Sequence, residues 1–442
     1  MSFPRYPSYK DSGVEWLGEV PAHWGLPKLK SIASFSGGGT PSRENLAYWN
    51  GDIPWVSPKD MKAERIIDAE ESITEEGLSG SASNLLPPGR VLMVVRSGIL
   101  KHTIPIAINE IAVALNQDMK ALEFDTNKCL GRFFLRWVQG FNDRLLLAWA
   151  KQGATVESIE HNYLADTVIP LPDVAEQMCI AAFLDRETAK IDGLVAEQRR
   201  LMELLKEKRQ AVISHAVTKG LNPDAPMKPS GIEWLGDVPA HWDVTKVKWI
   251  AEMQSGHTPD KKVPAYWENG DIPWVSLNDT GYLKDHDYIT ETAYSISQLG
   301  IENSSARLLP PRVVVFSRDA TIGRCAITTR PMAVSQHFIA WVCGELMIPE
   351  YLLLRLRSMT FELERLTTGA TLKTIGMPDV RTILTPVPPL PEQKAIIEFV
   401  SNQTNQLDTL TAEAQRAIDL LQERRTALIS AAVTGQIDVR SH

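Results

Sequence analysis

Two long stretches of the chain alternate apolar and polar residues with a helical period. Between about residues 176 and 217 the sequence has one glycine, Gly193, and no proline. Apolar residues in both stretches recur in steps of three, four and seven, which is typical of helices that pack along one face. The predicted contact positions are Ile180, Leu184, Ile191, Leu194, Leu201, Leu205 and Val212 in the first helix, and Ile396, Val400, Leu407, Leu410, Ala414, Ala417, Leu421 and Leu428 in the second.

The regions before the helices predict short β-strands. Residues 91–95 and 313–316 are compact apolar runs close to proline pairs, as in buried strands. Pro54 and Pro273, in the repeated sequence GDIPW, should lie at a strand entrance or a sheet edge, because proline has no N–H to donate. Proline-rich stretches at 169–173 and 385–393 end these regions.

The sequence contains one internal duplication. SGVEWLGEVPAHW at 12–24 recurs as SGIEWLGDVPAHW at 230–242, and LLKEKRQAVISHAVT at 204–218 recurs as LLQERRTALISAAVT at 420–434. The offset stays between about 216 and 223, far longer than the repeat of a solenoid, which is about 20–50 residues. We therefore expect domains at 1–173 and 220–389, each followed by a helical region, at 174–219 and 390–436.

This layout predicts an α+β fold with two similar mixed α/β domains. The two long helices are expected to pack as an antiparallel coiled coil, with the whole chain arranged about a pseudo-twofold axis. A helix of about 42 residues spans roughly 63 Å. Such a rod fixes the spacing between two domains, which a flexible linker would not do.

Composition limits the possible functions. Apolar content of 44% with 23% charged residues is typical of a soluble globular protein. No run of about 18 apolar residues predicts a membrane span, and the first residues do not resemble a signal peptide, so we expect a cytoplasmic protein. The four cysteines and nine histidines show no metal-binding spacing. The net charge of −8 argues against a simple nucleic-acid binder, so any DNA contact must come from local surfaces or from partners.

Several motifs occur in the same order in both halves. Gly38, Thr40 and Pro41 form a GxTP element that Gly256, Thr258 and Pro259 repeat. It is followed by YWxGDIPWVS, by LLPP with an apolar run, by GAT at 153–155 and 369–371, by a proline-rich stretch ending in Glu-Gln, and by the long helix. This order, over nearly the whole chain, resembles the specificity subunit of type I restriction-modification systems.

The resemblance implies a non-catalytic DNA-reading subunit. Each domain would be a target recognition domain that reads one half of a bipartite, asymmetric site in double-stranded DNA. The helices would set the spacer and bind two methyltransferase (M) subunits, and restriction (R) subunits would join through the complex. S-adenosylmethionine, ATP and Mg would be bound by these partners, with no cofactor and no metal in this chain.

Candidate DNA contacts are donor side chains on loops beside the predicted strands. Arginine and lysine favour guanine or phosphate, and asparagine and glutamine favour adenine. The candidates are Arg96, Lys101, His102, Asn116, Gln117 and Lys151 in the first domain, and Arg318, Arg324, Gln336, His337 and Lys373 in the second. An ordinary surface or hydrogen-bonding role is the alternative for each. The repeated tryptophans belong to the shared frame, so we expect them in the core.

Other functions fit the sequence less well. The glycines at 37–39 and the DIPW at 52–55 resemble methyltransferase motifs, but the glycine run is not repeated and DIPW lacks the second proline. No GxxxxGK(S/T) loop for ATP is present. A duplicated protein-interaction scaffold without direct DNA readout remains the alternative, and it would suit the acidic composition.

Overall fold

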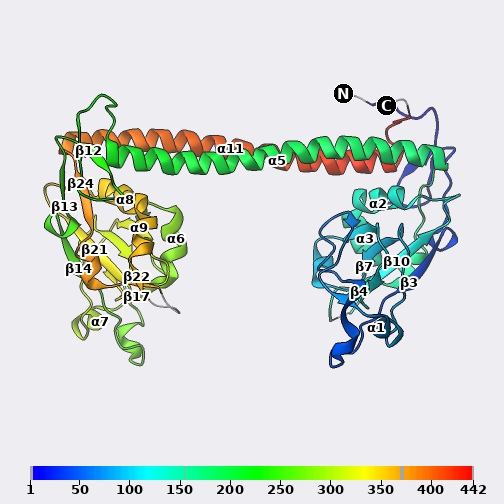
Figure 1. The fold of residues 1–442 in the computed structure, drawn as a ribbon, viewed down its shortest axis with the longest axis horizontal. Coiled ribbons are helices and arrows are strands. Elements are labelled where there is room, and N and C mark those ends of the chain that lie inside the picture. Colours follow the sequence, from blue (N-terminus) through cyan, green and yellow to red (C-terminus); the bar gives the residue numbers. More distant parts are fainter. Residues whose placement is uncertain (1–2, 154, 369–372, 441–442) are drawn as a thin grey trace. The chain divides into compact units, whose positions relative to one another are not determined.

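The computed structural model describes residues 3–153, 155–368 and 373–440, in two compact units. Unit 1 consists of residues 1–198 and 415–442, and unit 2 of residues 199–414. Each unit contains one mixed α/β domain and part of each long helix (Figure 1). The helices are thus shared between the units, whereas the sequence predicted them as regions of their own.

The domain of unit 1 is built on a five-stranded sheet in the order β3-β10-β7-β8-β5 and a three-stranded sheet in the order β6-β4-β9. All pairs in the larger sheet are antiparallel except β5 with β8. The elements are β1 (Tyr9–Asp11), β2 (Glu19–Pro21), β3 (Ala33–Gly37), β4 (Trp49–Val56), β5 (Arg65–Ile66), β6 (Ser72–Ile73), α1 (Glu75–Ser79), β7 (Val91–Val94), β8 (Ile106–Asn109), β9 (Ala114–Leu115), β10 (Met119–Phe124), α2 (Gly131–Gly140), α3 (Asn142–Trp149), α4 (His161–Ala165) and the long helix α5 (Val174–Lys219), with 3-10 turns at Leu29–Ser31, Leu46–Tyr48 and Gly98–Lys101.

The domain of unit 2 repeats both sheets, as β14-β21-β18-β19-β16 and β17-β15-β20. Its elements are β11 (Met227–Pro229), β12 (Asp237–Pro239), β13 (Asp243–Lys246), β14 (Ala251–Ser255), β15 (Ile272–Val275), α6 (Thr280–Asp285), β16 (Tyr288–Ile289), β17 (Tyr294–Ile296), α7 (Gln298–Glu302), β18 (Val314–Ser317), β19 (Cys325–Thr328), β20 (Ala333–Val334), β21 (Phe338–Cys343), α8 (Pro349–Ser358), α9 (Thr360–Arg365), β22 (Thr367–Thr368), β23 (Thr374–Ile375), α10 (Met377–Val380), β24 (Leu384–Val387) and the long helix α11 (Leu390–Val433), with 3-10 turns at Val247–Trp249, Pro264–Tyr266 and Leu277–Asp279. The predicted α+β class with two similar domains is confirmed.

The position of the first DIPW proline differs from the prediction, whereas Pro273, the second residue of β15, lies at the strand entrance. Pro54 lies inside β4, the central strand of its sheet, opposite Ser72. The amide of the next residue, Trp55, donates toward β6, so the nitrogen of Pro54 faces the other side of the strand. On that side β9 pairs only from Trp55 onward. Proline is tolerated here because the strand is locally unpaired where its N–H would point.

The Glu-Gln pair at the start of each long helix attaches the helix to its domain. The buried Gln177 accepts from the amide of Leu130 (2.8 Å) and donates to two loop carbonyls, and Gln393 makes the same three bonds, with Ile348 as its donor (2.9 Å). Glu176 accepts from the indole of Trp24 (3.2 Å), as Glu392 does from Trp242. The repeated PAHW and Glu-Gln motifs are thus two halves of one structural joint.

The long helices run antiparallel in each unit (Figure 1). In unit 1 the beginning of α5 lies beside the end of α11, and Arg425 pairs with Asp192 (3.0 Å). In unit 2 the end of α5 lies beside the beginning of α11, and Arg209 pairs with Asp408. Both members of one pair are offset by 216 residues from their counterparts, so the duplication has produced the same interhelical bond twice.

Three of the predicted helix contact positions lie outside the buried face. Leu194, Leu201 and Leu410 are 52%, 41% and 46% exposed. Between residues 188 and 212 the buried or partly buried residues of α5 follow a strict three-four spacing instead: Thr188, Ile191, Val195, Gln198, Met202, Leu205, Arg209 and Val212. The prediction failed there because it followed apolar residues, whereas the buried face also contains Thr188, Gln198 and Arg209.

The remaining predicted contact positions are buried or partly buried. Those that are buried are Ile180, Leu184, Ile191, Leu205, Ile396, Val400, Leu407 and Ala414, and those that are partly buried are Val212, Ala417, Leu421 and Leu428.

The two domains are held to their helices by different chemistry. In unit 1 the largely buried guanidinium of Arg136 on α2 pairs with Asp185 of α5 and with Glu64 (both 2.7 Å). Glu64 also reaches Arg425 of α11 (3.3 Å). In unit 2 the Tyr351 hydroxyl on α8 donates to the carbonyl of Val217 (3.0 Å). Both joints are packed with apolar residues, to which unit 1 adds a largely buried ion pair and unit 2 a neutral hydrogen bond.

Candidate nucleic-acid interface

In unit 2 all five predicted DNA-contact residues border the loop that follows β18. Within this loop Ser317 donates to the carbonyl of Arg324 (2.8 Å), Arg318 to that of His337 (3.0 Å) and Ala320 to that of Lys373 (2.9 Å). The side chain of His337 lies 2.7 Å from the carboxylate of Asp319. Residues 317–324, 336–337 and 373 thus form one surface at the end of β18.

The buried carboxylate of Asp319 organises this surface. It is 4% exposed, and its two oxygens contact the His337 imidazole and the Thr374 hydroxyl (both 2.7 Å). The Arg318 guanidinium donates to the carbonyls of Gln336 (3.4 Å) and Ile375 (3.3 Å). Arg318 therefore mainly connects two loops of the protein through hydrogen bonds. Gln336 and Lys373 are exposed.

In unit 1 the equivalent surface surrounds Arg96, whose side chain is 59% exposed and lies 3.9 Å from Asp118. Arg96 pairs in an isolated bridge with Ser158, and the amide of Lys151 donates to the Ser158 carbonyl (2.8 Å). Arg96, Lys151 and the 116–118 turn are therefore neighbours. Of the repeated GAT triplets, Ala154 and residues 369–371 lie outside the described residues.

The other three candidates of the first domain have different surroundings. Lys101 and His102 are exposed on the 3-10 turn after β7, where the Asn142 side chain donates to the His102 carbonyl (3.3 Å). Asn116 is 6% exposed, and its side chain accepts from the amide of Asp118 (3.0 Å). Asn116 therefore builds the turn, and we do not retain it as a DNA contact. Gln117, the next residue, is exposed.

Sequence reasoning missed Asp118, Asp319 and Thr374. The two domains align as LNQD at 115–118 and VSQH at 334–337, so Asp118 and His337 occupy the same place after a shared glutamine. Comparison of the two halves could have identified this position. The role of Asp319 and Thr374 depends on a loop contact between residues more than fifty positions apart, which the sequence does not indicate.

A positively charged group lies beside this turn in unit 1. The Lys120 ammonium on β10 is 3.0 Å from Nδ1 of His161, whose ring packs edge-on against Phe35. Burial lowers the pKa of Lys120, and burial and the nearby ammonium lower the pKa of His161. His161 is therefore neutral at pH 7 and accepts a hydrogen bond from the lysine.

Comparison with known proteins agrees with this duplicated arrangement. The family model described as the type I restriction modification DNA specificity domain matches residues 21–200 and again 239–419. The chain belongs to this family. It is thus a DNA specificity subunit, a class in which catalysis is left to partner subunits.

Two curated relatives illustrate the similarity. The type I restriction enzyme EcoR124I/EcoR124II specificity subunit of Escherichia coli is 35% identical over 200 residues, which cover 45% of this chain and 46% of that protein. The MjaIX specificity subunit of Methanocaldococcus jannaschii is 24% identical over 447 residues, covering 96% of this chain and 95% of its own. The match to the first relative therefore spans about half of its length.

Solved structures share the fold. A structure described as showing complex assembly and conformational transition of the type I R-M system superposes with a TM-score of 0.71 at 15% identity, covering 95% of this chain and 99% of its own. The HsdS subunit from Thermoanaerobacter tengcongensis gives 0.54 at 16% identity, with 95% and 98% coverage. At these identities the comparison shows the fold alone.

Of the repeated tryptophans of this specificity subunit, two pairs are buried, whereas Trp16, Trp49, Trp234 and Trp267 are partly buried. Trp24 and Trp242 are fully buried, and Trp55 and Trp274 are 3% and 5% exposed. The indoles of Trp55 and Trp274 donate to the backbone of the GxTP loops (2.9 and 3.1 Å). A ring enclosed in this way cannot stack on a nucleic-acid base, so these residues belong to the shared frame, as the sequence predicts.

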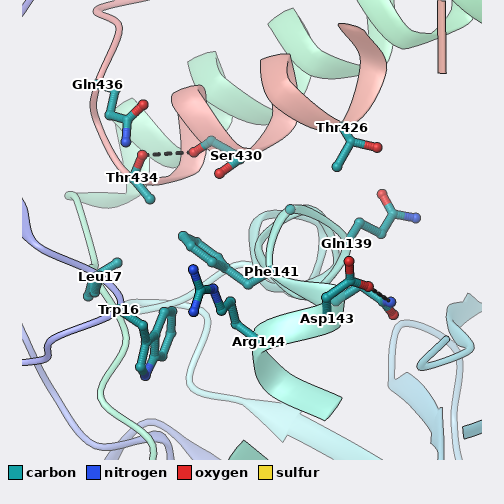
Figure 2. A pocket seen from close by; sticks show the side chains of 12 residues that line it. Trp16, Leu17, Gln139, Phe141, Asp143, Arg144, Thr426, Ser430, Thr434 and Gln436 are labelled. Atoms are coloured by element: carbon teal, nitrogen blue, oxygen red, sulfur yellow. Dashed lines mark hydrogen bonds between the residues drawn. The ribbon is translucent and has the colours of Figure 1, made fainter. Parts of the chain in front are cut away.

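Figure 2 shows a cavity of about 330 Å³ in unit 1, between the α2–α3 corner and the end of α11. Its walls include the Trp16 and Phe141 rings, the charged Asp143 and Arg144, and Ser430 on α11. Among the described residues its lining contains none of the predicted DNA contacts. The cavity is part of the joint between domain and helix rather than of the candidate interface.

The thiols of this specificity subunit are free. Burial raises the pKa of Cys325 to about 11 and that of Cys129 to about 12, so both stay protonated at neutral pH, whereas Cys179 is exposed. Within the described ranges no three His, Cys, Asp or Glu side chains come together in a way that could hold a metal ion. In the same ranges, no helix is both long and apolar enough to cross a bilayer.

Proposed function

We propose that this chain is the sequence-reading subunit of a type I restriction-modification complex. Each domain reads one half of a bipartite, asymmetric target in double-stranded DNA, and the long helices set the distance between the halves. The observation that carries this proposal is one frame built twice with different side chains at the same surface. Asp118 beside Arg96 in the first domain corresponds to His337 beside Asp319 in the second.

The electrostatics of each surface support different base preferences. A carboxylate at position 118 can accept from an exocyclic amino group of a base, such as that of cytosine. The imidazole at the equivalent position 337 holds Nδ1 against the Asp319 carboxylate and offers Nε2 instead. Two domains that differ at this position favour different bases. The two half-sites therefore differ, and the target is asymmetric.

The long helices are proposed to bind two methyltransferase subunits. Leu194 and Leu410 are exposed at equivalent positions of α5 and α11, and Leu204 and Leu420 are a second equivalent pair, at 52% and 64%. Exposed leucines that recur at the duplication offset suit two copies of the same apolar partner surface. Restriction subunits join through the complex, and S-adenosylmethionine, ATP and Mg bind to the partners.

Methylation mapping tests the DNA-reading part of this proposal. The host genome is sequenced for modified adenine with and without this gene, and with a chain in which residues 239–389 come from another specificity subunit. Deletion should abolish methylation of one split motif, and the exchange should alter one half of that motif only. A palindromic motif, or a motif that persists after deletion, contradicts the proposal.

Co-purification tests the docking of partners. Leu194→Glu combined with Leu410→Glu should reduce recovery of the methyltransferase subunits at least ten-fold, while Leu46→Glu, at an 82% exposed leucine in the first domain, should not. Equal recovery in all variants contradicts docking on these leucines. A steep dependence of DNA affinity on salt would separate DNA reading from a pure protein scaffold.

A further inference from the structure

Both domains contain the same pair of polar side chains on the candidate interface. The Thr40 hydroxyl donates to Oε1 of Gln117, and the Thr258 hydroxyl donates to Oε1 of Gln336. Both glutamines are exposed. The threonine comes from the GxTP motif and the glutamine from the turn before β10 or β21, about 77 residues later in the chain. The duplication has therefore kept a surface contact between distant segments.

The shared frame explains how each threonine reaches its glutamine. A Cβ at Gly38 would overlap the carbonyl oxygens of Leu115 and Asn116, and one at Gly256 would overlap that of Val334. Glycine is therefore required for the GxTP loop to lie against the turn. One amide of each loop donates to the turn, from Gly39 to Leu115 (2.9 Å) in the first domain. The matching bond in the second domain is 3.1 Å.

The threonine determines what the glutamine can offer to DNA. A glutamine that reads adenine uses its amide oxygen and nitrogen together. Here the threonine occupies one of the two lone pairs of Oε1, whereas the amide nitrogen keeps two N–H groups as donors. In the second domain one of the two N–H groups of Gln336 points to Nε2 of His337 (3.3 Å), which leaves the other.

The residue after the glutamine differs between the domains. Asp118 faces Arg96, while the His337 ring is fixed by the buried Asp319 (2.7 Å). In both domains, therefore, a glutamine with the same N–H donor is followed directly by a residue that differs between the domains, Asp118 or His337. Contacts that are common to two readers of different half-sites cannot distinguish those half-sites. The part of DNA common to both is the sugar-phosphate backbone.

We propose that Gln117 and Gln336, each oriented by its GxTP threonine, donate to a DNA phosphate, and that the following residue, Asp118 or His337, contacts base edges. The contact fixes the register of the domain on the duplex, and the variable residue selects the base. This inference rests on the proposed function and deepens it, because it separates backbone contacts from sequence-determining ones.

The test uses the full chain assembled with its methyltransferase subunits, bound to the target duplex and to duplexes with one substituted base pair in the second half-site. Gln336→Met should weaken binding about ten-fold on all of these duplexes, as expected for a lost hydrogen bond to a charged group. The methylated motif should not change. Thr258→Val should weaken binding less, and Thr258→Ser should restore it. His337→Ala should instead change the preference at one base pair.

Each outcome has one meaning. If Gln336→Met leaves affinity unchanged, or alters the methylated motif, the phosphate contact is refuted while the proposed function stands. If Thr258→Ser binds as weakly as Thr258→Val, the hydroxyl does not orient the glutamine. If the motif does not depend on this chain at all, the proposed function fails. Calorimetric melting of each variant confirms that the fold is retained.

Discussion

Replacement of Arg355 by methionine should stabilise unit 2. Arg355 lies on α8, is 1% exposed, and has its guanidinium 5.0 Å from the centre of the Trp234 ring. One nitrogen donates to the Ser358 hydroxyl (2.7 Å). Among the described residues, the buried Nε and Nη2 atoms have no hydrogen-bond partner. The Arg355 side chain is thus a buried cation, and the Trp234 ring and the Ser358 hydroxyl offset part of the hydration that it loses on burial.

The cost of this cation follows from its protonation equilibrium. Burial lowers the pKa of Arg355 from 12.5 to about 10. A change of this size corresponds to about 3 kcal/mol that disfavours the charged form in the folded state. Because the folded-state pKa lies below the unfolded one, the cost is fully present below about pH 10 and falls as pH rises through this range.

Methionine, like arginine, has an unbranched side chain of similar length, but it is apolar and carries no charge. Part of the gain is offset by the lost interaction with Trp234, which is worth up to about 2 kcal/mol. The net stabilisation should be about 1–3 kcal/mol, in line with other replacements of buried charges by apolar residues. At roughly 2–4 °C per kcal/mol for a unit of this size, the unfolding transition should rise by several degrees.

Differential scanning calorimetry at pH 7, with hydrogen exchange of the α8 peptides to assign the transition to unit 2, measures the effect. Arg355→Lys keeps a buried charge without the planar stacking group and should be destabilising. Arg357→Met, two residues away at a more exposed ion pair, serves as the matched control. A loss of stability of more than about 1 kcal/mol in Arg355→Met would refute the reasoning, because it would mean that the guanidinium is fully compensated.

Three further predictions concern the frame and the joints. Gly38→Ala and Gly256→Ala should each destabilise their domain by about 1–3 kcal/mol in thermal melts, since the added methyl group overlaps backbone oxygen atoms. Arg425→Ala should cost about 1–2 kcal/mol in urea unfolding, more than Arg209→Ala, because Arg425 is less exposed and contacts two carboxylates. The pKa of Glu64 is lowered, because neighbouring arginines outweigh the effect of burial. Its contribution to stability is therefore lost as pH falls below about 4.5, and Glu64→Gln should make acid unfolding less steep.

Each of these predictions has its own control. Gly37→Ala, where an added Cβ meets no atom within 4 Å, should melt like the original protein, and equal losses at Gly37 and Gly38 would rule out the steric explanation. Equal costs for the two arginine variants would show that the second carboxylate contributes nothing. If the stability of Glu64→Gln falls with decreasing pH as steeply as that of the original protein, the Glu64 carboxylate of the original protein is not stabilised in the folded state.

Much of the fold follows from periodicity and repetition. The sequence predicts the first helix from about 176 to 217, and the helix runs from 174 to 219; the strands predicted at 91–95 and 313–316 lie at 91–94 and 314–317. The helix contact positions were less predictable. A buried face that contains Gln198 and Arg209 cannot be separated from its neighbours by hydrophobicity, since Leu194 and Leu201 are more apolar yet exposed.

The candidate interface was predictable in part, for a related reason. Donor side chains on loops could be selected from the sequence, and in unit 2 all of them border one loop. Their roles could not be selected, because Arg318 and Asn116 look like free donors until their hydrogen bonds to the backbone are known. Burial and contacts between loops determine whether such a side chain connects two loops of the protein or can contact DNA. Both depend on the tertiary structure.

The duplication supplies a comparison that a single domain does not offer. Leu130 and Ile348 donate to equivalent glutamines, so Trp137 and Arg355, seven residues later, occupy the same place in α2 and α8. Both are fully buried, one as an aromatic ring and the other as a cation. The shared fold therefore tolerates either an aromatic ring or a cation at this position and does not require one particular chemistry there. The glycines and threonines of the GxTP loops, by contrast, are the same in both domains and make the same contacts. The exchange of Arg355 should therefore change stability and leave the methylated motif intact, while the exchange of His337 should change the motif and also weaken the loop, because Asp319 loses a partner.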